Sequence, residues 1–476
     1  MRKVPVPFCG PFDERVAKSI SAETCINWYP AIVNSHDRQI MTLKMRPCLK
    51  FNQTLSIGPH RGGHVHDGLL YVVSNNKVYS ITTADVATEV GTLNTFSGFV
   101  GMASNGFDLL IVDGTDGYVW NGTNFDVITD ADFVDAKQCK FLHGYFIVNK
   151  PGTGEFYISG LYPTHANLVN GTGWTSTDFA TAEVDPDDLL AIEVDHQELW
   201  LLGEFSAEQF FDSGNALFPF EAQPSGFIEW GIIAPWSIGK GDNTVVWLAQ
   251  NRNGGRQVVK ATSFTPEVIS TDSLEERMNG YTTVSDAYAF VVKGADKHLF
   301  YVLTFPTQNE THVYDFATNL WHSWESTNVG RFRVATHIYF NGKSYMGDAI
   351  NGDLYTFDNK TDADNGVSVV RSRKTAHSSN SQNLLFCSAM HFVVDVIRQP
   401  LSGQGSDPQM ALYISNDRGN TYGNAMTASL GKLGEYGKLI SFPQLGSYTD
   451  RVYEVRISDP VRTDLISAFA EIEAEK

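Results

Sequence analysis

The chain has 476 residues, more than the about 250 to 300 at which a single hydrophobic core stops growing, so one compact core is excluded. Hydrophobic residues make up 42% of the chain and charged residues 19%, a composition that excludes an intrinsically disordered protein. Asp and Glu number 54 against 35 Lys and Arg, and a net charge of −19 excludes tight wrapping of DNA because such a surface repels phosphates. Aromatic residues at 12% and 41 glycines favour strands joined by tight turns, so we expect an all-β protein.

The first 58 residues carry several prolines and little strand alternation, which predicts an extended N-terminal arm over residues 1–58. We expect Trp28 and Tyr29 to anchor this arm on a neighbouring subunit, because buried aromatic side chains carry much of the energy of an interface. Residues 1–7 lack the apolar core of a signal peptide, and no stretch approaches the roughly 18 consecutive apolar residues of a membrane helix. A soluble protein that does not use the general secretory route is expected.

Residues 59–375 contain a unit that recurs seven times: a polar turn, an apolar strand, a second turn and a second strand. The starts of successive units are 38 to 54 residues apart, and a four-stranded propeller blade repeats about every 40 to 50 residues. Turns such as Asn105-Gly106 allow positive φ at both central residues, which selects a hairpin. The pattern predicts a β-propeller of six or seven blades, with an irregular β-sandwich as the alternative. The units begin at His66, Asn105, His143, His196, Asp242, Asp296 and Asn341.

A Ser- and Asn-rich stretch at residues 377–383 marks a boundary near residue 376. Alternating apolar and polar residues follow it, for example at 410–415, 451–457 and 465–472. About 100 residues with strands of this kind predict a separate C-terminal β-sandwich over residues 376–476.

One segment of the predicted sandwich matches a known local motif. Residues Ser415, Asp417, Gly419 and Tyr422 resemble the Asp-box, S-x-D-x-G-x-x-aromatic, of sialidases and related propellers. In those families the Asp accepts backbone N–H bonds within a turn and does not touch substrate. We interpret it here as a structural turn, since the arginines and tyrosine of a sialidase site cannot be assembled.

Other candidate site residues are scattered. The carboxylates Glu183, Asp185, Asp187 and Asp188 could hold Ca²⁺, but without EF-hand spacing they are interpreted as a solvated acidic loop. His64, His66 and His196 have no partner at metal-ligand spacing and are interpreted as turn residues. The five cysteines form no C-x-x-C pair and are predicted to be buried thiols. We assign no catalytic, cofactor-binding or metal-binding residue, and no cofactor.

Basic residues concentrate once, at Arg371, Arg373 and Lys374, just before the boundary. Without interleaved aromatic residues this is a weak signal for nucleic acid, and contact with an acidic protein neighbour fits it at least as well.

The order of these parts resembles a known family. Its members are the packaged-DNA stabilisation proteins of short-tailed bacteriophages (podoviruses), also called tail hubs or head-closure tail accessory factors, and the resemblance covers nearly the whole chain. The segments that carry it are Ile26–Pro30, Met45–Lys50, Arg61–Gly63, His298–Leu303, Trp321–Trp324 and Leu412–Gly423.

The resemblance implies a structural virion protein of the tail, not an enzyme, assembled in the host cytoplasm. Copies of it, six in the family, would form a ring beneath the portal and its adaptor, hold tailspikes or tail fibres and a tail needle, and close the DNA channel so that the genome is retained until ejection. DNA would pass through the channel without tight binding, and no part would insert into a membrane. The alternative from another class is a propeller glycoside hydrolase or lectin acting on host surface polysaccharide.

Overall fold

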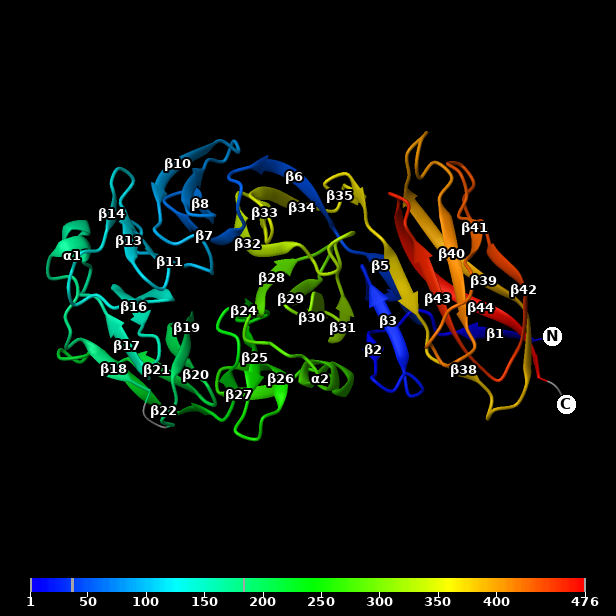
Figure 1. The fold of residues 1–476 in the computed structure, drawn as a ribbon, viewed down its shortest axis with the longest axis horizontal. Helices are drawn as coiled ribbons and strands as arrows, with labels where there is room; N and C mark the ends of the chain where they lie inside the picture. Colours follow the sequence, from blue (N-terminus) through cyan, green and yellow to red (C-terminus); the bar gives the residue numbers. More distant parts are fainter. Residues whose placement is uncertain (1, 36–37, 183–184, 475–476) are drawn as a thin grey trace.

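The computed structural model describes residues 2–35, 38–182 and 185–474. A ring of small sheets occupies one end of the elongated molecule and a β-sandwich the other, where both termini lie (Figure 1). The two helices that the structure describes, α1 (His165–Asn170) and α2 (Asp272–Asn279), have six and eight residues, too few to span a bilayer. The predicted all-β class, a propeller followed by a sandwich, is confirmed.

The described residues form a propeller of seven blades. In each blade the first strand lies nearest the centre of the ring and the following strands pair antiparallel outward. Blade 1 has β7 (His60–His66), β8 (Leu69–Ser74), β9 (Lys77–Ile81) and β10 (Ala87–Thr92). Blade 2 has β11 (Gly101–Ser104), β12 (Leu109–Val112), β13 (Gly117–Trp120) and β14 (Phe125–Val127). Blade 3 has β15 (Cys139–Leu142), β16 (Tyr145–Asn149), β17 (Glu155–Ile158) and β18 (Phe179–Thr181).

The remaining blades follow the same plan. Blade 4 has β19 (Leu189–Asp195), β20 (Glu198–Gly203), β21 (Ala207–Asp212) and β22 (Phe220–Ile228). Blade 5 has β24 (Gly239–Gly241), β25 (Thr244–Gln250), β26 (Arg256–Thr262) and β27 (Thr265–Val268), with β23 (Gly231–Ile232) also paired to β25. Blade 6 has β28 (Tyr288–Lys293), β29 (Leu299–Phe305), β30 (Glu310–Asp315) and β31 (Leu320–Ser323). Blade 7 has β32 (Val334–Phe340), β33 (Lys343–Asp348) and β34 (Asp353–Asp358), and its fourth strand is β6 (Cys48–Thr54).

Each of the seven repeat units begins at the turn between the first two strands of one blade. The repeat therefore corresponds to the blade, and the number of blades is seven. Both central residues have positive φ at five of these turns, whereas at Asn105-Gly106 only Gly106 does, with φ of 92°. Asp67 and Gly68 have φ of 44° and 69°, and Asn341 and Gly342 have φ of 47° and 74°. Side chains with a β-carbon tolerate this region poorly, which is why Asn, Asp and Gly recur there.

Successive side chains of a strand point to opposite faces of its blade and enter different cores. On β8, Tyr71 packs between blades 1 and 2, and its neighbour Val72 packs between blades 1 and 7. An apolar cluster of this kind lies between every adjacent pair of blades. The ring is therefore held by seven separate cores instead of one. Four of the five free cysteines are buried as predicted, and Cys9 is half-buried.

The sandwich places two sheets face to face around a core that contains Trp28, Met390 and Tyr453. Two small elements, β35 (Ala363–Asp364) and β36 (Val367–Ser368), form a hairpin between the two domains. The first sheet contains β1 (Arg2–Val6), β4 (Trp28–Ser35), β5 (Arg38–Met45), β39 (Leu385–Arg398), β42 (Ile440–Tyr448) and β44 (Arg462–Ala474). The second contains β2 (Asp13–Glu14), β3 (Ala22–Ile26), β37 (Arg371–Lys374), β38 (Ser378–Ser379), β40 (Gln409–Ser415), β41 (Met426–Ser429) and β43 (Asp450–Ile457).

The predicted N-terminal arm is not an extended tether, because its residues form the strands β1 to β6. The expectation that its two aromatic residues anchor a neighbouring subunit is wrong. Trp28 lies in the sandwich core, and Tyr29 lies between blades 6 and 7, where its ring is 5.1 Å from that of Phe300. Both side chains are fully buried within their own chain. The domain boundaries at residues 58 and 375 stay predictions.

Deletion of residues 1–58 is expected to yield an aggregated chain. The deletion removes β6, so the edge of β34 in blade 7 has no partner strand and can pair with another chain. It also removes Trp28 from the sandwich core. Size-exclusion chromatography and circular dichroism measure the outcome. Deletion of residues 1–6, which removes only β1, is the matched control and should stay soluble. A soluble, cooperatively unfolding protein without residues 1–58 would contradict the observed role of β6.

Candidate functional site: the joint between propeller and sandwich

A network of buried hydrogen bonds and ion pairs lies where the two domains meet. Strand β3 stands between them, beside β31 of blade 6 and β37 of the sandwich, so hydrogen-bonded sheet runs from one domain into the other (Figure 1). On the propeller side β3 runs parallel to β31, with Ile26 opposite Ser323. On the sandwich side β3 runs antiparallel to β37, with Cys25 opposite Arg373. The backbone N–H of Asn27 donates to the carbonyl of Ser323 at 2.9 Å.

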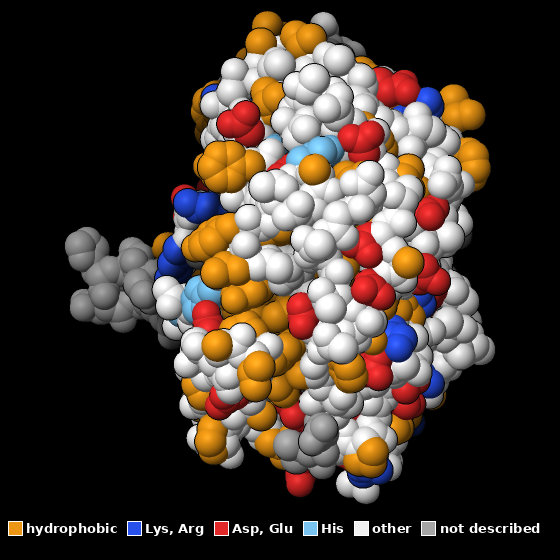
Figure 2. Space-filling model, turned by 90° about the vertical axis from the view of Figure 1, so that its left-hand side faces the viewer, with side chains coloured by type: hydrophobic (Ala, Val, Ile, Leu, Met, Phe, Trp, Pro, Cys, Tyr) orange, Lys and Arg blue, Asp and Glu red, His pale blue; other side chains and the backbone are white. Residues whose placement is uncertain are grey.

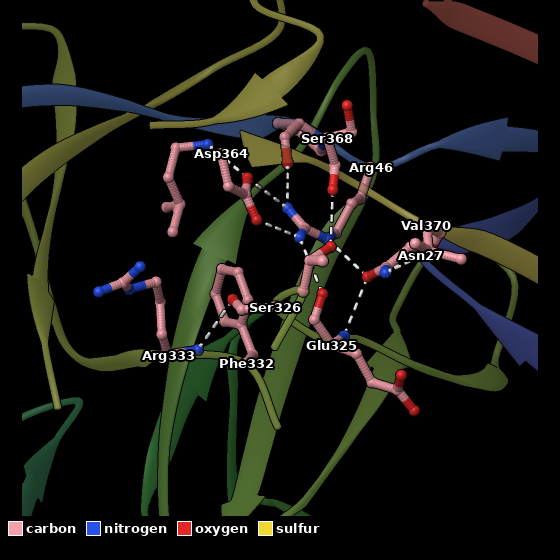
Figure 3. A network of polar contacts seen from close by, with 12 residues as sticks. Asn27, Arg46, Glu325, Ser326, Phe332, Arg333, Asp364, Ser368 and Val370 are labelled. Carbon is pink, nitrogen blue, oxygen red and sulfur yellow. Dashed lines mark hydrogen bonds and ion pairs between the residues drawn. The ribbon is translucent and has the colours of Figure 1, made fainter. Parts of the chain in front are cut away.

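Arg46, the first residue after β5, is the centre of this joint (Figure 3). Its guanidinium forms a two-pronged contact with the carboxylate of Asp364 in β35, at 2.6 and 3.2 Å. It also donates to Asn27 Oδ1 at 2.8 Å and to the carbonyl oxygen of Glu325 at 3.1 Å. The amide of Asn27 in turn donates to the carbonyl of Val370 at 2.7 Å. One buried side chain thus connects the N-terminal segment, the blade 6 to blade 7 connection and the segment leading to the sandwich.

The charges of this pair are both removed from water, since the side chains of Arg46 and Asp364 are 0% and 5% exposed. Burial alone would lower the pKa of Arg46, but the adjacent Asp364 carboxylate outweighs it and raises the pKa. Asp364 further accepts the backbone N–H of Leu49 at 2.9 Å. A buried pair satisfied in this way is costly to break from one side, because the remaining charge has no partner.

The predicted basic cluster belongs to the same joint. Arg371 and Arg373 are fully buried, and their guanidinium groups donate mainly to backbone carbonyls. Arg371 donates to Asp459 at 2.5 Å, and burial lowers its pKa to about 10. Arg373 donates to Phe8 at 2.7 Å and pairs with the Glu23 carboxylate. The interpretation as a surface for nucleic acid or for an acidic neighbour is therefore wrong for these two residues. Arg373 fastens the N-terminal segment to the sandwich, and Arg371 bonds backbone carbonyls within the sandwich. Lys374 packs its ammonium 5.5 Å from the ring centre of Tyr422.

The Asp-box segment forms the turn that its sequence indicates. The Asp417 carboxylate accepts the backbone N–H groups of Asn420 and Thr421 at 3.1 and 2.8 Å, and the hydroxyl of Ser415 at 2.7 Å. Hydrogen bonds from Thr421 first, and from Ser415, hold the pKa of Asp417 well below its usual range. The Asp417 side chain is exposed, so the bonds stabilise a turn at the surface.

The acidic loop has structural contacts in its described part. Glu183 lies outside the described residues. Asp185 forms an ion pair with Arg252, and Asp187 accepts the backbone N–H groups of Phe205 and Ser206 at 2.7 and 3.1 Å. No cluster of three or more metal-ligating side chains is found among the residues that the structure describes.

Histidines connect neighbouring blades, whereas the sequence interpretation gave His66 and His196 only as turn residues. His66 bonds Ser104 of the next blade at 2.7 Å, and His196 bonds Asn243 of the next blade at 2.6 Å. Two further residues were missed: His143 bonds Asp212 at 2.9 Å, and His165 bonds Asp108 and Asp126, each at 2.9 Å. Their partners lie 39 to 69 residues away in sequence, so no local signal could have shown these contacts.

The central channel of the propeller is lined by all seven blades and has a cavity volume of about 410 Å³. Phe99, before blade 2, contacts Trp236 of blade 5 and Tyr288 of blade 6, with ring centres 5.3 and 5.2 Å apart. Because these blades lie on opposite sides of a seven-membered ring, the aromatic side chains span the channel. A DNA duplex, whose major groove alone is about 12 Å wide, cannot pass through it.

Comparison with protein families identifies the chain. A family model described as bacteriophage P22 Gp10, beta-propeller, matches residues 13–362, and one described as bacteriophage P22 Gp10, beta-sandwich, matches residues 371–473. The chain belongs to the bacteriophage P22 Gp10 family. It is therefore a structural protein of a phage virion that stabilises packaged DNA.

Similar solved structures include a streptogramin B lyase, at 11% identity over 64% of this chain and 96% of that one, with a TM-score of 0.43. The N-terminal domain of Nup159 has 12% identity over 65% and 95%, with a TM-score of 0.38. The Pan2 WD40 domain of Neurospora crassa has 10% identity over 64% and 90%, with a TM-score of 0.39. We draw nothing from these likenesses beyond noting them. No curated protein matches the sequence.

Replacing Arg46 by Met should lower the free energy of unfolding by about 3 to 5 kcal/mol, because it leaves the buried Asp364 carboxylate without its partner. Urea unfolding measures the change. The control is Arg398→Met, which removes an ion pair of the same type, with Asp362 at 2.6 Å, at a site where the arginine is 38% exposed. That loss should be below about 1 kcal/mol. Equal effects of the two substitutions would contradict the assigned importance of Arg46.

Replacing Asp417 by Asn should lower the thermal midpoint at pH 7, and the difference from the unchanged protein should shrink as the pH falls. The pKa of Asp417 is lowered by folding, so its contribution is complete above its unfolded value of about 3.9 and is lost as the pH falls through the folded value. Differential scanning calorimetry from pH 7 to pH 3 tests this. Asp132→Asn, an exposed carboxylate of a propeller loop, is the control. A difference that grows toward low pH would overturn the assignment.

Proposed function

We propose that this protein is the tail hub of its phage. In this proposal several copies, six by the family resemblance, form a ring that joins the portal and its adaptor to the distal tail. The ring holds tailspikes or tail fibres and a tail needle, closes the DNA channel and retains the genome until ejection. Subunits would be assembled in the host cytoplasm and end in the virion tail.

The observation that carries the proposal is the joint. Sheet pairing across β3 and the buried Arg46–Asp364 pair make the propeller and the sandwich one body. A connector that seals pressurised DNA has to transmit force between its neighbours without bending, and a sheet-continuous joint suits this role better than a flexible linker.

The blocked propeller channel supports a ring of copies. Since the contact between Phe99 and Trp236 closes the centre of one propeller to DNA, a DNA channel has to lie between copies. A net charge of −19 suits the wall of such a channel, because an acidic surface does not hold the phosphate backbone that must later slide along it.

The surface of the propeller rim supports the proposed contacts with other tail proteins. Figure 2 shows apolar side chains gathered on this side of the molecule among scattered acidic ones. A groove of about 640 Å³ lies between the outer strands of blades 3 and 4 and is lined by Phe179, Phe210, Phe218 and Phe220. Phe179 is exposed there and Phe218 is partly exposed, whereas Phe210 and Phe220 are buried. Exposed apolar surface with polar surroundings is typical of sites where proteins dock.

Heads filled with DNA in the absence of this chain test the proposal. We expect such heads to lose DNA to an added nuclease, and the purified chain, but not an unrelated acidic protein, to restore protection. Sedimentation should detect a ring on heads or in solution. Linear duplex DNA should bind the isolated chain poorly even at low salt, where phosphate attraction is strongest. Heads that stay nuclease-sensitive after addition of the chain, or tight binding of duplex DNA, would refute the hub.

A further inference from the structure

The mouth of the propeller channel carries an unusual concentration of positive charge for an acidic protein. Two lysines, Lys140 and Lys240, and one carboxylate, Glu193, lie at the channel mouth. The other cationic lining residue, Arg61, is buried, and its guanidinium donates to backbone carbonyls of the loop before blade 2, so its donors do not face the channel. Burial lowers the pKa of the two lining histidines, His64 and His337, to about 4, so both are neutral at pH 7. The lining is therefore net positive in a chain whose total charge is −19.

The two lysines are held at the mouth by one carboxylate. Lys140 Nζ of blade 3 is 2.6 Å from one oxygen of Glu193 of blade 4, and Lys240 Nζ of blade 5 is 3.1 Å from the other. Lys240 also donates to the backbone carbonyl of Val194 at 2.8 Å. One carboxylate cannot neutralise two ammonium groups, and their side chains remain 30% and 45% exposed. Their unused N–H donors are thus available to an incoming anion.

The rest of the channel lining is mainly apolar. Met102, Ile238, Val291 and Ile338 line the cavity, and the spanning contact of Phe99 with Trp236 lies where the inner strands begin. The Nε2 atom of His337 is buried and has no hydrogen-bond partner in the structure. The volume of about 410 Å³ falls in the range of about 300 to 1,000 Å³ that is typical of small-molecule sites.

We propose that this channel mouth binds a small organic anion, a carboxylate carried on an aromatic or branched apolar body. The carboxylate contacts the ammonium groups of Lys140 and Lys240, and the apolar body enters the channel above the spanning aromatic side chains. Inorganic anions fill the charged part alone, and neutral apolar molecules fill the apolar part alone, so neither matches the whole cavity. This inference does not rest on the hub function, and each can fail without the other.

Benzoate is the probe, with benzamide as its neutral isostere and acetate as the carboxylate without an apolar body. Saturation-transfer NMR and calorimetric titration on the purified full chain measure binding. Benzoate should bind at least about tenfold more tightly than benzamide, because a hydrogen bond to a charged group contributes roughly that factor or more. It should also bind at least about tenfold more tightly than acetate, because burial of an aromatic ring contributes a similar factor. A benzoate affinity no greater than that of benzamide, or no benzoate binding, would overturn the proposal.

Three substitutions locate the site. Lys240→Gln should weaken benzoate binding at least about tenfold, and Lys297→Gln, an exposed lysine at the blade 6 turn, should leave it unchanged. Glu193→Gln should tighten binding, because it removes the carboxylate that competes for the same ammonium groups. A purely structural triad predicts the opposite pattern, in which Glu193→Gln only destabilises the fold and Lys240→Gln leaves the affinity for benzoate unchanged. Thermal unfolding of each variant confirms folding, and Lys240→Gln alone decides the outcome if Glu193→Gln does not fold.

Discussion

The whole structure depends on how the N-terminal segment is shared between the two domains. Strands β3, β4 and β5 lie in the two sandwich sheets, and the chain then crosses the joint to β6, the fourth strand of blade 7. Neither domain is therefore complete without residues that precede the propeller in sequence. Blade 7 needs β6 because three strands leave an open edge, and the sandwich needs Trp28 and Met45 to fill its core. To complete blade 7, folding must therefore bring residue 48 to residue 358, a contact of high sequence separation and high entropic cost.

The Arg46–Asp364 pair explains why this arrangement is specific. A hydrophobic contact at the joint would tolerate small changes in angle between the domains, whereas a two-pronged guanidinium–carboxylate contact has a defined plane and direction. The additional bonds from Arg46 to Asn27 and to the carbonyl of Glu325 fix the positions of these two chain segments relative to the segment that carries Asp364. The desolvation of both charges makes a misaligned joint costly, so the pair selects one relative orientation of propeller and sandwich.

The ring itself is stabilised differently. Seven clusters between blades bury the apolar residues, and polar contacts at the turns, such as His143–Asp212 and His165–Asp108, connect blades at the surface. In the channel the same seven blades supply the two features with chemical consequences: aromatic side chains that close the passage and a charged mouth. A phage protein of this family thus combines a propeller whose own channel is closed with a second domain that is joined to it by continuous sheet.

The amino-acid sequence by itself determined the blades, since the period of the repeat and the turns at Asp67-Gly68 and Asn341-Gly342 are local signals of hairpins with positive φ. It also determined the Asp-box turn, whose donors lie within four residues of Asp417. Only the tertiary structure decided the roles of Trp28, Tyr29, Arg371 and Arg373, which sequence patterns place on the surface and the fold buries. The pairing of β6 with β34 and the Arg46–Asp364 contact each join residues about 300 positions apart. The contacts of Glu193 at the channel mouth join residues about 50 positions apart. Burial and charge pairing depend on which distant segments meet, and no local pattern of hydrophobicity or charge carries that information.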